Sequence, residues 1–212
     1  MTASKLSLYN GALRRCNERK LATTTDNVPA RYHLDAIWDE DPIQLMLEKY
    51  RWKFARKVVE WNYNSAYEPS FGFQYVFDRP SDYVRLVSIS GDENFSDPLR
   101  AYDPENGLIY CDWQTIYLKY VSNDSAYGKD YSKWSKLFEQ LVASYMGYQL
   151  AIALNKSEAD LKRMDYEMTK LEKEAKNLDA MEDPTKFPKQ GSWAASRTGG
   201  SRGDSNRGPL IG

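Results

Sequence analysis

The spacing of apolar residues changes twice along the chain, and this change limits the possible folds more than any other feature. Residues 1–50 place apolar side chains three and four apart, as one face of a helix does. Residues 52–122 instead contain short β-branched and aromatic runs separated by turn signals. Helical spacing returns at about residue 131. Strands placed between helical segments predict an α+β fold, namely a helical bundle with an inserted, small antiparallel β region.

The predicted body covers residues 1–182, and its four helices are expected at residues 3–18, 28–50, 131–154 and 157–181. The second segment begins after two candidate caps, Asp26 and Asn27, and Pro29 is tolerated in its first turn. Pro42 interrupts this segment, because proline removes a helical hydrogen bond and clashes with the preceding turn. It is therefore either one kinked helix or two helices, with Asp41 capping the second.

The third helix has two kinds of side. Its apolar face carries Trp134, Leu137, Phe138, Leu141, Tyr145 and Ile152. A thin side carries Ala143, Gly147 and Ala151, where another backbone can approach closely.

The fourth helix carries a seam of apolar residues that alternate three and four apart. A capping-box-like pair, Ser157 and Asp160, precedes it, with Asp in place of the usual Glu or Gln. The spacing is that of a heptad seam over nearly three heptads. The seam consists of Leu161, Met164, Met168, Leu171, Ala175 and Leu178.

The β region, at about residues 52–122, contains five runs with strand character. The last two runs lie on either side of Asp112 and Trp113 and are close enough in sequence to pair as a hairpin. The expected strands are Lys57–Trp61, Gln74–Phe77, Val84–Ser90, Gly107–Cys111 and Thr115–Val121.

Residues 183–212 form a predicted extended C-terminal arm. The arm holds six of the twelve glycines and three of the nine prolines, so it cannot bury enough surface to fold alone. Its net charge is +3, which leaves the body at −4. The arm therefore favours acidic surfaces, and the body has no global attraction for DNA. The expected partner-binding residues are Phe187, Trp193, Arg197, Arg202, Arg207, Leu210 and Ile211.

No enzyme motif stands out in the sequence. His33 is the single histidine, and no glycine-flanked serine accompanies it. The acidic cluster Asp35, Asp39, Glu40 and Asp41 lacks the spacing of a metal or acid–base site and is expected to be a solvated helix face. Cys16 and Cys111 suit buried apolar positions. We expect no cofactor, no metal and no enzymatic activity.

Neither a signal peptide nor an apolar run long enough to span a membrane is visible in the sequence. We therefore expect synthesis in a cytoplasm and no association with a membrane.

Several short motifs resemble the head-to-tail adaptor (connector) proteins of tailed bacteriophages, in particular the tail tubular protein A-like family. The resemblance covers most of the chain and departs from the family pattern at Pro42 and beyond Arg197. The motifs that carry it are residues 8–13, 18–22, 50–55, 80–85, 116–121 and 184–193, with Leu34 and Trp38.

The resemblance implies a structural virion protein that forms a ring of twelve copies between the capsid portal and the tail. DNA passes through the lumen of such a ring during genome ejection without being bound specifically. It implies the portal protein and a tail or nozzle protein as partners, with the arm reaching the portal or neighbouring subunits. Two alternatives remain open: a muralytic cell-wall hydrolase, and a DNA-binding module that uses the arginines of the arm.

Overall fold

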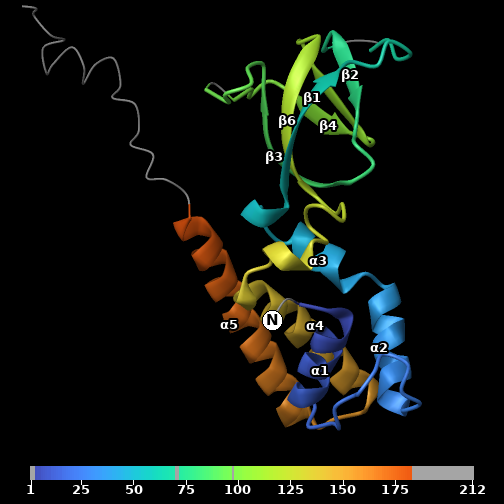
Figure 1. Cartoon of the computed structure of the whole chain (residues 1–212). Helices are drawn as coiled ribbons and strands as arrows, with labels where there is room; N and C mark the ends of the chain where they lie inside the picture. The colour runs from blue at the N-terminus through green and yellow to red at the C-terminus, as the bar shows by residue number, and fades with distance from the viewer. Residues whose placement is uncertain (1–2, 70–71, 97, 183–212) are drawn as a thin grey trace, which may run out of the picture. The chain divides into compact units, whose positions relative to one another are not determined.

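The computed structural model describes residues 3–69, 72–96 and 98–182 (Figure 1). One compact unit covers Met1–Ala180, and a second unit begins at Met181. The contacts analysed below lie within the first unit. The predicted arm, with all seven of its expected partner-binding residues, lies outside the described residues.

The fold is α+β, as predicted, with five helices and two small antiparallel sheets in the described residues. The helices are α1 (Lys5–Arg15), α2 (Pro29–Asp39), α3 (Pro42–Glu48), α4 (Lys136–Ala153) and α5 (Glu158–Met181). The strands are β1 (Arg56–Asn62), β2 (Tyr75–Asp78), β3 (Tyr83–Ser90), β4 (Asp103–Glu105), β5 (Leu108–Cys111) and β6 (Thr115–Ser122). Short 3₁₀ turns occur at Lys53–Ala55 and Tyr131–Lys133.

Helix α4 lies at the centre of the bundle and contacts α1, α2 and α3. Its thin side meets α1, as predicted: a Cβ added to Gly11 would lie 2.9 Å from the Cβ of Ala143. A Cβ added to Gly147 would lie 3.3 Å from the carbonyl oxygen of Ala12. Small residues at this crossing therefore let the two backbones approach closely. Ile152, expected on the packed face of α4, is instead 46% exposed.

The segment at residues 28–50 forms two helices rather than one. The chain breaks at Asp41, which has a left-handed φ of 50° and accepts a hydrogen bond from the backbone N–H of Gln44. Asp41 therefore caps α3, as the second of the two predicted alternatives required. Neither Asp26 nor Asn27 caps α2, which begins after Val28 with Pro29 in its first turn. Asp26 instead accepts hydrogen bonds from the preceding turn.

The sheets correct the predicted hairpin. Strands β5 and β6 do not pair with each other, because the chain passes from one sheet to the other between them. The first sheet has the order β1-β6-β3, and the second has the order β2-β5-β4. Asp112, in the connection, accepts a hydrogen bond from the backbone N–H of Gln74. This contact holds the end of β5 against the start of β2.

Side chains from both sheets share one core. It is made of Phe77, Ile89, Ile109, Cys111, Ile116, Leu118 and Tyr120. The base of the β region joins the bundle: Val121 belongs to the helical core, and Arg85 donates to the backbone carbonyl of Glu48 at 2.7 Å. The β region is therefore inserted between α3 and α4 in sequence and is anchored to the bundle at its base.

Candidate interaction surfaces

The histidine and the cysteines of the described chain do not form a catalytic or metal site. His33 is exposed on α2, and within the described ranges no group of three His, Cys, Asp or Glu side chains could hold a metal ion. Both cysteines are buried; burial raises the pKa of the Cys16 thiol to about 11 and also raises that of Cys111. A buried thiol with a raised pKa is a poor nucleophile.

The four acidic residues in and just after α2 have different surroundings. Asp35 accepts a hydrogen bond from the Tyr9 hydroxyl at 2.7 Å and pairs with Arg31 at 2.6 Å. Burial, and then the hydrogen bond to Asp35, raise the pKa of Tyr9. Asp41 pairs with Lys129 at 2.5 Å in addition to capping α3. Asp39 and Glu40 are exposed. The solvated helix face predicted for this cluster therefore applies to only two of its members.

The seam of α5 faces the helical core of the same chain. Met164 and Ala175 are buried, while Leu161, Met168 and Leu171 are partly buried and pack against that core. Leu178 lies apart from them, with 40% of its side chain exposed. The heptad spacing is thus satisfied within the bundle at five of its six positions.

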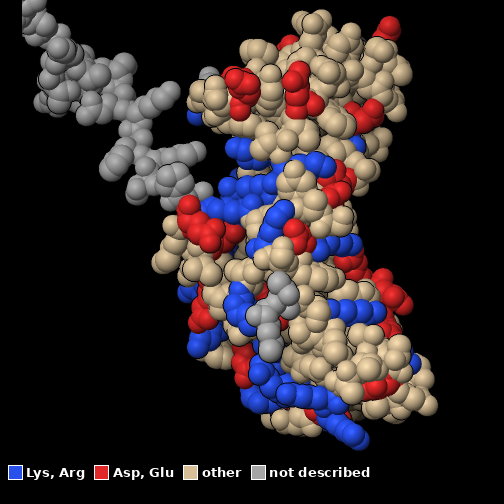
Figure 2. Space-filling view, in the orientation of Figure 1, with Lys and Arg blue, Asp and Glu red and all other residues tan. Residues whose placement is uncertain are grey.

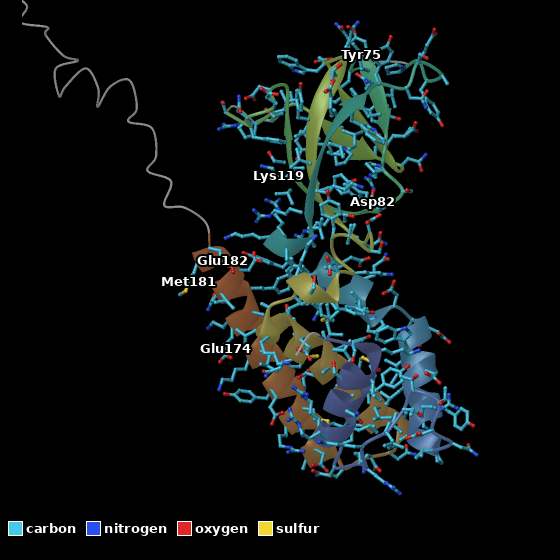
Figure 3. The ribbon with its side chains drawn as sticks, viewed as in Figure 1. Tyr75, Asp82, Lys119, Glu174, Met181 and Glu182 are labelled. Atoms are coloured by element: carbon cyan, nitrogen blue, oxygen red, sulfur yellow. The ribbon has the colours of Figure 1, made fainter. Side chains whose placement is uncertain are left out.

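A half-buried carboxylate, Asp82, holds the base of the β region. Asp82, labelled in Figure 3, accepts hydrogen bonds from Lys57 at 2.8 Å, from the Tyr120 hydroxyl at 2.8 Å and from the Ser122 hydroxyl at 2.6 Å. Burial alone would raise the pKa of Asp82, but these three donors outweigh it and hold the pKa below its ordinary value. The network ties β1, β6 and the turn before β3 together.

A cavity of about 370 Å³, which we name the aromatic hollow, opens on the second sheet. Three of its lining residues carry carboxylates, and none of these three forms an ion pair with the described residues. Aromatic rings form much of the remaining wall. The hollow is lined by Tyr67, Glu68, Pro69, Gly72, Phe73, Val76, Asp103, Glu105 and Tyr110.

Aromatic side chains are also exposed on the loops of the β region. Tyr67 and Trp113 are each 50% exposed, and Tyr63 is 40% exposed. The Tyr63 ring packs against Tyr75, which Figure 3 labels, at a centroid distance of 5.0 Å. Asp and Glu side chains also lie on the surface of the β region (Figure 2). The β region therefore offers aromatic anchors beside negative charge.

A second cavity, of about 410 Å³, lies where α1 crosses α4, and we name it the basic groove. Four of its lining residues are Lys or Arg, and Glu139 is the carboxylate among them. It is lined by Ser7, Asn10, Gly11, Arg14, Arg15, Lys20, Lys136, Glu139, Gln140 and Ala143. Lys and Arg gather at the end of the bundle where α1 ends (Figure 2).

Sequence reasoning missed both cavities. The aromatic hollow depends on β4, a three-residue strand that contains Pro104 and has no apolar pattern. Such a strand can be recognised only from its pairing with β5 in the structure. The basic groove joins residues more than one hundred positions apart. The sequence carries a signal for only one side of the groove, namely the cluster of basic residues Arg14, Arg15, Arg19 and Lys20 near the end of the first helix. Three of these four line the groove.

Comparison of the sequence with models of known protein families gave no match, and comparison with curated proteins gave none either. Within the described part of the chain, none of the helices combines the length and the apolar character required to cross a bilayer.

Proposed function

We propose that this chain is a structural subunit of a tailed-bacteriophage virion, one copy of a ring that connects the capsid portal to the tail. In this proposal, twelve copies form the ring, DNA passes through its lumen during ejection, and the protein occupies the neck of the virion. The proposal rests on the resemblance described above and on one structural observation, the exposed aromatic surface of the β region.

That surface is suited to contact with another protein. Aromatic side chains are the residues that most often carry binding energy at interfaces, and exposed aromatic clusters commonly mark such sites. Here Tyr67 lines the aromatic hollow, and the β region that carries the exposed rings has a core of its own, separate from that of the helical bundle. One subunit can therefore meet a tail protein through its β region and a portal protein through its arm.

The arm supplies the second attachment. Its apolar anchors are spaced along a polar, basic segment, as in segments that order only on binding. Each arm alone need bind only weakly, because copies in one ring engage together and their combined attachment is firm.

The test is assembly of phage particles that carry altered versions of this protein. Tyr67→Ala should reduce the fraction of DNA-filled heads that carry tails, as counted by electron microscopy. Tyr166→Ala is the matched control, since Tyr166 is 71% exposed on α5, away from the hollow. Deletion of residues 183–212 should release the ring from the portal. Normal tail attachment in both the Tyr67→Ala and the arm-deleted particles would contradict the proposal.

A second candidate function, cell-wall hydrolysis, is favoured by one observation. Asp103 and Glu105 point to the same face of β4 and line the aromatic hollow with Glu68, and aromatic rings beside paired carboxylates are a common arrangement for binding and cleaving sugars. Zymography on peptidoglycan decides the matter: clearing by the purified protein that disappears in Glu105→Gln would establish hydrolysis. Absence of clearing would remove this candidate.

A further inference from the structure

The basic groove contains more positive charge than its own residues neutralise. Lys136 pairs with Glu139, the carboxylate that lines the groove, and Glu139 also accepts a hydrogen bond from Ser7 at 3.3 Å. Arg14 and Lys20 are exposed, and neither has an ion-pair or hydrogen-bond partner for its charged group among the described residues. Two cations at the groove are therefore available to a ligand.

A third cation, Arg15, is half-buried in the lining of the groove and is held by two hydrogen bonds. Its guanidinium donates to the backbone carbonyl of Gly11 at 3.0 Å and to that of Gln140 at 3.3 Å. No carboxylate of the described chain lies within ion-pair distance of it. Burial, and then the neighbouring charge of Arg14, lower the pKa of Arg15. The charge of Glu167 partly offsets these two effects. A partly desolvated positive charge whose direct hydrogen bonds go to carbonyl groups is stabilised further by an incoming anion.

The remaining lining residues are uncharged apart from Lys136 and Glu139, and several of them are small. The side-chain amide of Gln140 has no hydrogen-bond partner in the described part of the chain, so its N–H groups are free to donate. Apolar surface comes from Gly11, Ala143 and the aliphatic parts of the long side chains, and none of the lining residues is aromatic. The groove thus lacks the apolar anchors that protein partners use and the rings on which unpaired bases stack.

Arginine, lysine and glutamine side chains around a positively charged hollow are the donors that contact DNA phosphates. We propose that the basic groove binds the phosphate backbone of duplex DNA without reading its sequence. This inference goes beyond the proposed function, because it assigns a ligand to the body of the subunit, and it holds whether or not the subunit forms a ring.

The test measures binding of the full-length protein to a fluorescein-labelled 24-base-pair duplex of mixed sequence by anisotropy, between 50 and 200 mM salt. Removal of two phosphate contacts should lower the slope of log K against log salt by about 2, since each contact contributes about 0.9. The variant Arg14→Ser with Lys20→Ser should therefore bind more weakly, and its difference from the native protein should grow about tenfold between 200 and 50 mM salt. Both side chains are exposed, so the fold is retained, which circular dichroism checks.

Two controls separate the groove from charge in general. Arg100→Ser with Lys173→Ser removes the same charge from two exposed positions outside the groove and should leave the salt slope unchanged. Changing Arg197, Arg202 and Arg207 to Ser removes charge from the arm while leaving the groove intact. In that background the two groove substitutions should still lower the slope by about 2.

Three results would overturn the inference. The first is that the full-length protein binds no duplex at 50 mM salt. The second is that the groove variant binds the duplex as tightly as its charge-matched control. The third is that labelled polyglutamate binds more tightly than the duplex and that the groove variant loses this binding. The groove would then be a contact site for an acidic protein. The oligomeric state, measured separately by mass photometry, reports on the ring.

Discussion

In the helical bundle, the Trp52 side chain is fully buried, packs edge-to-face against Phe138 at 4.9 Å and donates to the carbonyl of Met46. In the β region, by contrast, Trp113 is half exposed, and a charged group, Asp82, organises the base of the first sheet. Apolar packing holds the bundle together, whereas the small core of the β region is supported by a polar network. The β region can therefore present aromatic side chains to a partner at little cost to the fold.

The largest effect is expected from Trp52→Ala. It removes a buried aromatic ring from the helical core, so the free energy of unfolding should fall by about 3–5 kcal/mol. Urea denaturation followed by circular dichroism measures the loss. The matched variant Trp113→Ala should cost less than about 1 kcal/mol, because its ring is half exposed. Equal losses in the two variants would break the comparison between bundle and β region.

Asp82→Asn should have the next largest effect. The amide cannot replace the charge that accepts three hydrogen bonds, so we expect a loss of about 2–3 kcal/mol at pH 7. Asp103→Asn, an exposed control without an ion pair in the described residues, should change stability by less than about 0.5 kcal/mol. If the two variants were equally stable, the network would contribute nothing.

The contribution of Asp82 should also depend on pH. Its pKa in the folded protein lies below its ordinary value of about 3.9, so the stability that it adds is present above that value. This stability is lost as the pH falls through the lower, folded pKa. The difference in unfolding free energy between the native protein and Asp82→Asn should be largest at pH 7 and should shrink toward pH 3. A constant difference across this range would contradict the assignment.

Gly11→Ala should have a smaller effect, because two contributions oppose each other. The new Cβ would lie 2.9 Å from the Cβ of Ala143, and overpacking of this kind costs about 1–3 kcal/mol. Alanine in place of glycine within a helix returns about 1 kcal/mol, so a net loss of about 1 kcal/mol is expected. Adding Ala143→Gly should relieve the contact and recover part of the loss in the double variant. A more stable Gly11→Ala protein would show that the helices are not closely packed here.

The smallest effect on stability is expected from removing residues 183–212. The first compact unit ends at Ala180, and the described helical core extends from Leu8 to Ala175. The free energy of unfolding of the truncated chain should remain within about 0.5 kcal/mol of the full-length value. A larger loss would mean that the arm stabilises the body and not only its attachment.

The sequence was most informative where one segment determines its own structure. The α5 seam and the thin side of α4 follow from spacing alone, because helix faces depend only on the order of residues. Ser157 accepts from the backbone N–H of Asp160, as the capping-box pattern implied. The Asp160 carboxylate, however, accepts from the Ser157 hydroxyl and not from its backbone.

The sequence was less informative where distant segments meet. The expected hairpin at Asp112 failed because spacing along the chain cannot show that neighbouring strands enter different sheets. Strand β4 depends entirely on its pairing with β5. Both cavities, the aromatic hollow and the basic groove, are products of such long-range contacts, and for that reason neither could be predicted.

The central claim, that the chain is a ring-forming connector, is tested most directly by cryo-electron microscopy of virions that contain it, with symmetry determined where the protein lies. We predict a twelve-fold ring between the portal and the tail, with the β region in contact with a tail protein and the arm in contact with the portal. A single copy, or a location away from the neck of the virion, would contradict the account.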